Sequence, residues 1–484
     1  MYPVALAREK GLAMRTIALL LLASAALAQT PAFDAKAYVK FDQPTIVLNH
    51  VRVIDGTGAP AKPDQMIVIA KGKIQSIGAA GSQIPSGAQV LDLTGESAMP
   101  GIVGMHDHLY YPAPGRNVAM YPEHAWSFPR LYLAGGVTTI RTTGSVEPYT
   151  DLELKKDIDE GRMPGPKMHV TGPYLEGKGA YTPQMHELAD AEDAKRTVDY
   201  WISEGVENFK AYMNITRDEL RTAAEEAHKH NLKITGHLCS IGFREAAQIG
   251  IDDLEHGIVV DSEFAPGKQP DRCPPQKEIR DTLLKLDING EQIQSMIKDL
   301  IARHVAVTST LPVFEGFVPD RPPLRQANLD AMLPEARQAY LAVRDNMHKN
   351  AAQSPWPALF KKEMEFEYAF AKAGGLLLAG LDPTGNGAVV AGYGDQREIE
   401  LLVEAGFTPL EAIHIATYNG AKYLGELDHI GTLEPGKQAD IVVLKGDPSS
   451  RISDVENVEV VFKDGIGYDP AKLAKDANGF VGLK

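Results

Sequence analysis

Eight short apolar runs alternate with helix-like stretches through the middle of this chain, and this alternation limits the possible fold more than any other feature. Gly, Pro and polar residues bound the runs, which is typical of buried strands in a parallel sheet. The runs begin near Ile102, Val137, Met168, Phe209, Ile234, Asp253, Val305 and Leu376. Eight strand–helix repeats over about 250 residues favour an α/β fold of the closed (β/α)8 kind, a TIM barrel. An open doubly wound sheet is the less favoured alternative, because no Gly-x-Gly-x-x-Gly follows an early run.

One helix start within this region is marked clearly. Thr408 suits the N-cap position, Pro409 the first helical position, and Glu411 completes a capping box. A helix that begins at this point agrees with a barrel that ends shortly afterwards, before residue 421.

The two ends of the chain have a different sequence pattern from the middle. Residues 43–100 contain short strand-like runs separated by Gly, Pro and Asn, and similar runs return after residue 431. Neither set is long enough to make a stable sheet alone. We therefore expect one small β-sandwich domain built from residues 29–100 plus 421–484, with the barrel of residues 101–420 between its halves.

The barrel should also contain an insertion. His256 and Asp382 lie 126 residues apart although only two repeats separate them, which is about twice the usual spacing. We place the insertion within 258–370. Its Pro-rich and charged stretches are expected to cover the substrate site.

The amino-terminal residues read as a targeting segment. Arg15 precedes an apolar run over 17–22, and Ala26-Leu27-Ala28 forms a small-x-small cleavage signal. We expect a signal peptide over 1–28, with Met14 as an alternative start, and a mature protein that is periplasmic or secreted. A retained membrane anchor is less favoured, because the apolar run is too short to span a bilayer comfortably.

Composition narrows the classes of partner. The formal net charge is −15 and no block of Lys and Arg is present, so no nucleic-acid partner is expected. Hydrophobic residues make up 44% of the chain and charged residues 23%, which is typical of a globular protein. With only Cys239 and Cys273, no disulfide framework can be argued and a four-cysteine zinc site is impossible. The oligomeric state stays open, a homo-oligomer included.

Polar residues stand where several of the apolar runs end. His106 and His108 end the first run, and residues two apart in a strand point to the same face, so their imidazoles would lie side by side. Two such imidazoles form half of a metal site, whereas Asp107 between them would point the other way. The later runs end in Lys210, His237, His256 and Asp382. Each residue alone would more often be a packing, surface or turn residue. Their conjunction at the carboxyl ends of barrel strands predicts one site.

The ordered set His-x-His, Lys, His, His, Asp resembles the two-metal branch of the amidohydrolase superfamily. The likeness extends from residues 51–56 to 436–441. Residues 136–141 and 408–413 are similar to the secreted prolidase-like and imidazolonepropionase-like members of that superfamily.

The resemblance implies two divalent metal ions. His106, His108 and Asp382 would hold one ion, and His237 and His256 the other. Lys210, carboxylated on its side-chain nitrogen, would bridge both ions. Imidazole and carboxylate ligands favour Zn2+, with Mn2+, Co2+ and Fe2+ as alternatives.

The chemistry of such a site is hydrolysis. Two metal ions can share a water, lower its pKa and polarise a carbonyl group. Asp382 would act as general base and then as general acid. His169 and Tyr212 are further candidate catalytic residues that could stabilise an oxyanion, and Arg141 is a candidate clamp for a substrate carboxylate.

We therefore expect an exported, metal-dependent hydrolase of the C–N bond in a small substrate such as a dipeptide or an N-acyl amino acid. A metal-activated hydroxide would attack, with Asp382 as base. One alternative is hydrolysis of a cyclic amide, a lactone or a phosphotriester. Another is a non-catalytic binding or scaffold protein on the same fold. A small-molecule amide or peptide is the expected partner, without nucleic acid and without a stable membrane anchor.

Overall fold

The computed structural model describes residues 35–113 and 119–482 of the chain. The expected signal peptide over 1–28 lies outside these residues. Within the described ranges, no helix combines the length and the apolar character needed to span a membrane.

Strands from both ends of the chain pair in one mixed sheet of nine strands. Its members are β1 (Val39–Phe41), β2 (Thr45–Val53), β3 (Lys62–Ala70), β4 (Lys73–Ala79), β5 (Gln89–Asp92), β6 (Glu96–Pro100), β16 (Ile441–Lys445), β17 (Val458–Lys463) and β18 (Ile466–Tyr468). The strand order is β1-β18-β17-β16-β6-β2-β3-β4, with β5 beside β2.

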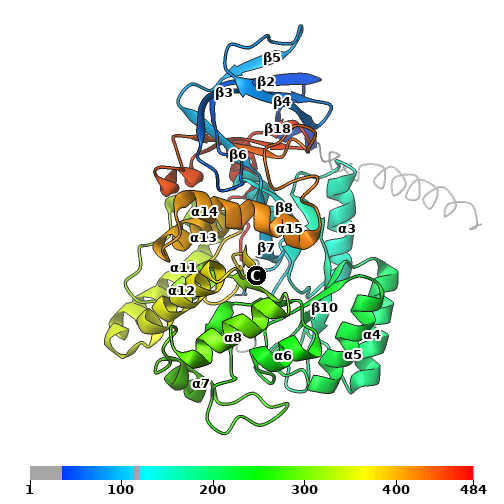
Figure 1. Ribbon diagram of the computed structural model, residues 1–484, viewed down its shortest axis with the longest axis vertical. Helices are drawn as coiled ribbons and strands as arrows, with labels where there is room; N and C mark the ends of the chain where they lie inside the picture. The colour runs from blue at the N-terminus through cyan, green and yellow to red at the C-terminus, as the bar shows by residue number, and fades with distance from the viewer. Residues whose placement is uncertain (1–34, 114–118, 483–484) are drawn as a thin grey trace, which may run out of the picture.

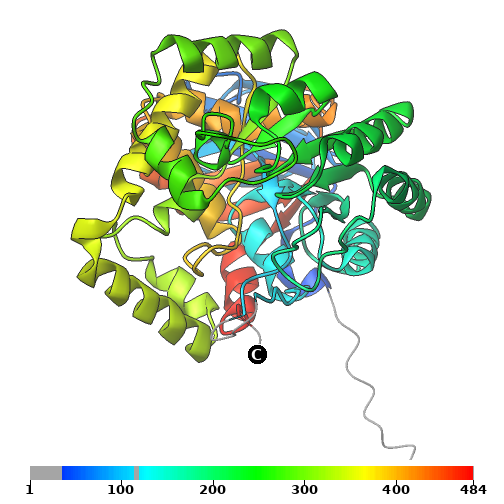
Figure 2. The same cartoon turned by 90° about the horizontal axis from the view of Figure 1, so that it is seen from below.

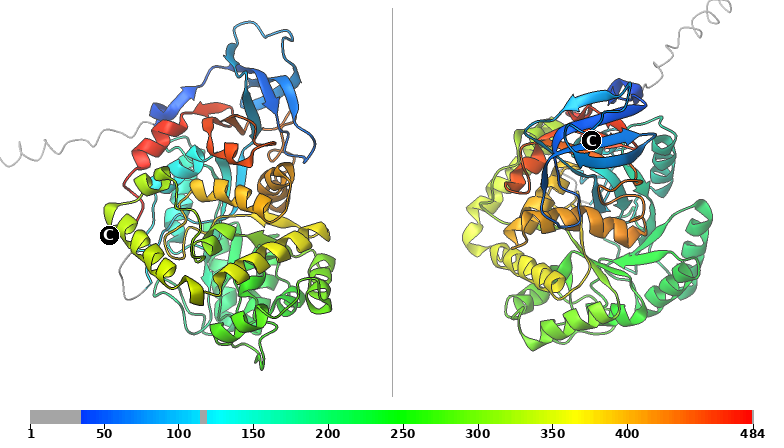
Figure 3. Two further views of the ribbon diagram at one scale, coloured as in Figure 1. Left: turned by 90° about the vertical axis from the view of Figure 1, so that its left-hand side faces the viewer. Right: turned by 45° about the horizontal axis from the view of Figure 1, so that its top comes forward.

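The two ends meet where β16 pairs antiparallel with β6, Ile441 opposite Pro100. Figure 3 shows the blue amino-terminal strands and the red carboxy-terminal strands side by side. One apolar core lies under both, with Ile46 and Ile67 from the first set and Phe462 from the second. The sandwich form and the domain boundaries at 100 and 421 stay predictions.

The middle of the chain forms parallel strands. They are β7 (Ile102–Asp107), β8 (Val137–Thr142), β9 (Lys167–His169), β10 (Thr171–Leu175), β11 (Asn208–Ala211), β12 (Lys233–Gly236), β13 (Asp253–Glu255), β14 (Ala306–Ser309) and β15 (Leu377–Ala379). All eight expected runs are therefore strands, and the third is divided into β9 and β10.

The parallel strands pair in two sheets, β7-β8-β9 and β10-β11-β12-β13-β14-β15. The edges of the sheets approach each other, because the Asp382 amide donates to the His106 carbonyl at 3.0 Å and the Ser145 amide to the Gly172 carbonyl at 3.1 Å. The α/β class with parallel strands is thus present. Closure of both sheets into one continuous barrel ladder stays a prediction.

Helices lie on the outside of the parallel strands (Figures 1 and 2). The α-helices are α2 (Ser127–Ala134), α3 (Pro148–Asp159), α4 (Ala191–Glu204), α5 (Arg217–Lys229), α6 (Phe243–Ile249), α7 (Gln276–Leu283), α8 (Glu291–Ala302), α9 (Leu311–Glu315), α10 (Gln326–Ala331), α11 (Pro334–Lys349), α12 (Trp356–Lys372), α13 (Tyr393–Glu404), α14 (Pro409–His414), α15 (Gly420–Leu424) and α16 (Pro470–Ala477). Short 3-10 turns are η2 (Ala35–Tyr38), η3 (Gly257–Val260), η4 (Ala351–Gln353) and η6 (Ile452–Glu456), and η5 (Ile415–Asn419) is a π-helix. The predicted capping box at Thr408 is confirmed, since its hydroxyl accepts from the Glu411 amide at 3.3 Å.

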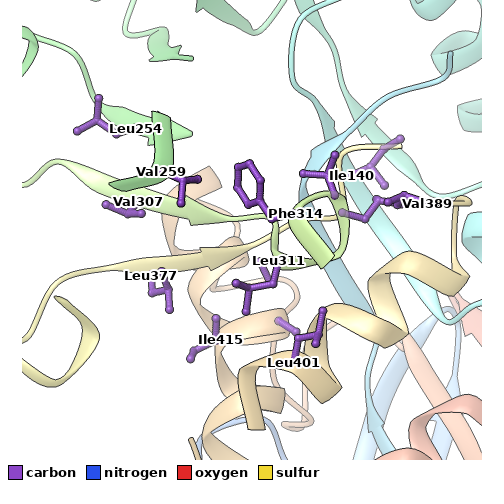
Figure 4. Packing of buried hydrophobic residues seen from close by; sticks show 14 of the residues in the cluster. Ile140, Leu254, Val259, Val307, Leu311, Phe314, Leu377, Val389, Leu401 and Ile415 are labelled. Atoms are coloured by element: carbon purple, nitrogen blue, oxygen red, sulfur yellow. The ribbon is translucent and has the colours of Figure 1, made fainter. Parts of the chain in front are cut away.

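The main core lies between these strands and helices. Leu254, Val307 and Leu377 come from three neighbouring strands, and they share one buried cluster with Leu401 and Ile415 of the helical layer (Figure 4). This burial on both faces explains why the strands read as continuous apolar runs rather than as alternating patterns.

Two long connections separate parallel strands from the helices that follow them. One runs from β13 to α8 and contains α7, and the other runs from β14 to α12 and contains α9 to α11. Both fall within residues 258–370.

The first connection is cross-linked to the loop after β12. Cys239 and Cys273 form a disulfide with their Cα atoms 4.8 Å apart. This corrects the expectation drawn from the cysteine count. Spacing along the chain could not reveal the pair, because 34 residues separate the two cysteines and only the folded connection brings them together.

A buried glutamate holds the turn that follows β13. Glu363 of α12 accepts hydrogen bonds from the Ile258 amide at 3.2 Å and the Val259 amide at 2.7 Å. Burial raises the pKa of Glu363 to about 8. His256 and Gly257 both adopt left-handed backbone angles here, with φ of 70° and 63°. A Cβ atom on Gly257 would lie 1.7 Å from Glu363 Oε1, so the turn requires glycine.

We predict that Gly257→Ala destabilises the protein far more than a left-handed glycine alone would explain. Gly161 is the matched control, because its φ is 70° and nothing lies within 4 Å of the added Cβ. Gly161→Ala should lower the free energy of unfolding by about 1–2 kcal/mol. Gly257→Ala should lower it by about 3 kcal/mol or more, since Glu363 must also move away from its backbone donors. Urea titration measures both. Equal losses would contradict the proposed clash.

Candidate metal centre

The six side chains expected at the strand ends line one cavity of about 500 Å3. His106 lies in β7 and Lys210 in β11, while His108, His237, His256 and Asp382 lie just beyond the ends of β7, β12, β13 and β15. Parallel strands bring these positions together because their carboxyl ends share one face. Asp107 does not line this cavity, in agreement with its expected orientation.

His106, His108 and Asp382 form the tightest group. One potential ligand atom from each lies within 4.8 Å of the others. Asp382 is the common neighbour: its oxygens lie 3.9 Å from His106 Nε2, 3.7 Å from His108 Nε2 and 3.8 Å from His256 Nε2. All four side chains are buried. Such a group offers imidazole and carboxylate donors to a divalent cation.

His256 connects this group to His237. The centroids of the His106 and His256 rings are 4.5 Å apart, and those of His237 and His256 are also 4.5 Å apart. Burial lowers the pKa of His237 to about 3, and it holds the pKa values of the other three histidines well below their usual range. The imidazoles are therefore neutral at pH 7, which is the form that binds metals.

Lys210 lies among these rings with 1% of its surface exposed. Burial lowers the pKa of its amine to about 8, although the carboxylates of Glu255 and Asp382 oppose the shift. A larger share of the amine is thus neutral than in an ordinary lysine. Burial likewise raises the pKa of Asp382 to about 6, against the hydrogen bond that Thr384 donates at 2.7 Å.

For three of the four histidines, a hydrogen bond to the second ring nitrogen sets the orientation of the imidazole. His106 Nδ1 donates to Glu255 at 2.6 Å, and His108 Nδ1 donates to the Gly144 carbonyl at 3.1 Å. His256 Nδ1 lies 2.8 Å from the Thr310 hydroxyl oxygen. Because the Nδ1 atoms are engaged, the Nε2 atoms of these histidines are left to face the cavity.

Arg141 lies beneath the cluster rather than in the cavity. It is 1% exposed, and one guanidinium nitrogen lies 2.8 Å from Asp253 and 3.0 Å from Glu255. Its Nε donates to the Met105 carbonyl at 2.8 Å. This corrects the suggestion of a substrate-carboxylate clamp, because the guanidinium is already occupied by buried acids. Arg141 instead holds Glu255, the acceptor for His106.

His169 is also placed away from the cavity. Its ring lies 3.7 Å from Glu207, which directly precedes β11, and 3.7 Å from Glu426, just beyond α15. These groups belong to the amino-terminal side of the strands, opposite the candidate metal ligands. The assignment of His169 as a catalytic residue is corrected accordingly, since β9 ends before the strand reaches the cavity and β10 supplies that end.

Tyr212 does line the cavity. Its ring centroid lies 5.0 Å from that of His237 and 4.9 Å from that of Tyr174. Burial raises its pKa well above the usual range, so its hydroxyl stays protonated and can donate a hydrogen bond. Its catalytic role remains a prediction.

Two further tyrosines were not expected from the sequence. Tyr110 stacks on His108 with ring centroids 4.4 Å apart, and its hydroxyl is hydrogen bonded to that of Tyr174. The signal for Tyr110 was present, because it follows His106 and His108 at the same spacing of two residues. Tyr174 could have been inferred only with the break between β9 and β10 known.

The opposite wall of the cavity is largely apolar and comes from the long connections and the start of α12. Phe314 and Phe317 stack against Trp356, with ring centroids 5.9 Å and 4.9 Å apart. Leu359, Gln276 and Arg280 complete this side. The segments expected to cover the site thus supply part of its lining.

Comparisons with known proteins agree with this arrangement. The sequence profile of the amidohydrolase family matches residues 97–265 and 389–466. A dihydroorotase from Syntrophus aciditrophicus is 26% identical over 82% of this chain and 89% of its own length. The match to an allantoinase from Streptomyces avermitilis is 29% identical but covers only 35% of this chain and 34% of that protein.

Among solved structures, a Xaa-Pro dipeptidase with bound methionine in its active site is similar with a TM-score of 0.66. It is 19% identical and the match covers 88% of this chain and 100% of the other, so the likeness concerns the fold. Since the family profile spans half of the chain, the predicted resemblance is confirmed: the chain belongs to the amidohydrolase family, whose members are hydrolases acting on C–N bonds.

Proposed function

We propose that this protein is a metal-dependent hydrolase that cleaves the C–N bond of a small amide, such as a dipeptide or an N-acyl amino acid. The observation that carries this proposal is the single cavity into which four histidines, Lys210 and Asp382 project from the strand ends. Family membership supports hydrolysis of C–N bonds, and the substrate class is our inference from the site.

The chemistry of these residues fits divalent cations. Four neutral imidazoles and a carboxylate are suitable donors for Zn2+. We propose that His106, His108 and Asp382 hold one ion and that His237 and His256 hold a second. Lys210 would bridge them once carboxylated, and its lowered pKa supports this, because only the neutral amine can react with CO2. When bound, the ions would supply an activated water at neutral pH and polarise the scissile carbonyl.

The side chains of the protein perform the remaining tasks. Asp382 accepts a proton during attack and returns it to the leaving amine, a role for which its position in the cavity beside three of the histidines is suited. Tyr212 donates its hydroxyl hydrogen to the developing oxyanion. Phe314, Phe317 and Trp356 restrict the access of bulk water to the bound substrate.

We also propose that the protein is exported. The support is the sequence pattern of Arg15, the apolar run over 17–22 and the small residues before residue 29. An exported enzyme of this kind would meet small peptides and acylated amino acids outside the cytoplasm.

The first test is metal dependence. We expect about two transition-metal ions per chain and hydrolysis of N-acyl amino acids or dipeptides. Chelation should abolish turnover, and added Zn2+ should restore it. Asp382→Asn should lower kcat by about 100-fold or more, whereas Asp218→Asn, which removes a carboxylate with an 84% exposed side chain, should not. A folded, active protein without metal would contradict the proposal. Elemental analysis and a screen of dipeptides, N-acyl amino acids and lactones provide the measurements.

A second test concerns Lys210. Lys210→Ala should lose metal and activity, because the bridging carbamate cannot form, and short-chain carboxylates added to the buffer should rescue part of both. Lys233→Ala is the matched control, since Lys233 is another barrel-strand lysine and its amine binds the Tyr423 carbonyl outside the cavity. Full metal retention in Lys210→Ala would show that Lys210 is no bridge.

A further inference from the structure

Arg280 is a charged residue of the active-site cavity that does not belong to the candidate metal centre. Among the described residues that line the cavity, the charged side chains are Lys210, Asp382 and Arg280. The first two belong to the candidate metal centre. Arg280 is therefore the cation that the proposed hydrolytic machinery leaves unused, in a wall that is otherwise apolar or uncharged.

The guanidinium of Arg280 is also unpaired, as far as the described residues go. No carboxylate in those residues lies within 4 Å of it and no side-chain hydrogen bond engages it. Its sequence neighbour Asp281 is paired with Lys277 at 2.5 Å instead. Arg280 is half-buried, so a guanidinium that would ordinarily seek an acid is held at the cavity without one. A planar guanidinium in this state is suited to bind a carboxylate through two parallel hydrogen bonds.

The helix that carries Arg280 is anchored to the metal centre. Arg280 belongs to α7, which is packed on the core through Ile279 and Leu283. Cys273, three residues before this helix, is disulfide-bonded to Cys239, two residues after His237. The cation is thus held at a defined place relative to a candidate metal ligand, which reduces the entropy lost when it binds a substrate.

The remaining lining indicates what the rest of the ligand is like. Phe314, Phe317 and Trp356 form one stacked aromatic wall, and Tyr110 and Tyr174 lie beside the histidines. Flat aromatic faces in a cavity of about 500 Å3 favour an apolar group of a small molecule. The whole chain carries a net charge of −15, so an anionic ligand would be attracted by cationic groups at the cavity, Arg280 among them.

We propose that Arg280 binds the free carboxylate of the substrate, while the aromatic wall receives its apolar side chain. This inference rests on the proposed hydrolytic function and makes its substrate class more specific. The cavity would select N-acyl amino acids and dipeptides that have a free α-carboxylate and an aromatic or large aliphatic side chain. Arg280 is then a specificity-determining residue and takes no part in proton transfer.

The test compares two probes that differ only at the carboxylate, N-acetylphenylalanine and N-acetylphenylalanine carboxamide. The metal-loaded wild type is compared with Arg280→Gln, Arg280→Lys and the control Lys277→Gln, whose side chain lies on the same helix with 81% exposed. For the acid, Arg280→Gln should raise KM by at least about tenfold, the effect of losing one charge-assisted contact. The kcat of Arg280→Gln should change little, and its KM for the carboxamide should not change. The KM of Arg280→Lys for the acid should lie between those of the wild type and Arg280→Gln.

Binding provides a readout that does not depend on turnover. Calorimetry with N-acetylphenylalanine should show weaker binding to Arg280→Gln than to the wild type and to Lys277→Gln. If the wild type binds this acid through Arg280 but hydrolyses no amide, the proposed function fails while the carboxylate site stands. If Arg280→Gln matches Lys277→Gln in KM and binding, or weakens the acid and the carboxamide equally, Arg280 does not recognise the carboxylate.

Discussion

The ion network around Arg141 is the interaction on which the candidate metal centre depends. Its guanidinium lies against Asp253 and Glu255, and Glu255 accepts the Nδ1 proton of His106. All of these groups are buried. Removing one partner from such a network leaves an uncompensated buried charge, at a cost of about 3–5 kcal/mol. The network therefore fixes both the orientation of a candidate metal ligand and the packing of five strands: β7, β8, β13, β12 through Thr235, and β14 through Thr308.

The backbone is also constrained at two candidate metal ligands that follow the ends of their strands. His256 and Asp382 both have left-handed backbone angles, with φ of 70° and 51°. Residues rarely adopt this conformation unless their surroundings enforce it, and such positions concentrate at functional sites. Glu363 holds the turn after His256 in its left-handed conformation. At Asp382, the hydrogen bond from its own amide to the His106 carbonyl helps to hold the backbone. The fold thus presents neutral imidazoles together with a carboxylate whose residue has left-handed backbone angles.

The strand positions could be predicted well because their cause is local. Continuous apolar runs bounded by glycine and proline report burial on both faces, and all eight runs proved to be strands. The convergence of six side chains on one cavity followed from the same reading, because carboxyl ends of parallel strands share a face. His169 shows where this reasoning ends: the chain breaks between β9 and β10, so the strand end that reaches the cavity belongs to β10, and Tyr174 rather than His169 lines the cavity. Arg141 shows a second limit of prediction from the sequence. Its buried partners Asp253 and Glu255 lie more than a hundred residues away along the chain.

The sequence by itself determined the repeating α/β pattern, the order of the histidines, Lys210 and Asp382, and through them the family. These features follow from spacing of two in a strand and from the apolar character that a buried strand needs. Only the tertiary structure decided which residues surround that set. The disulfide between Cys239 and Cys273, the aromatic wall from Phe314 to Trp356 and the place of Arg280 depend on how two long connections fold back over the strand ends. Contacts between residues far apart in sequence have no local signal, because the chain between them sets neither their distance nor their direction.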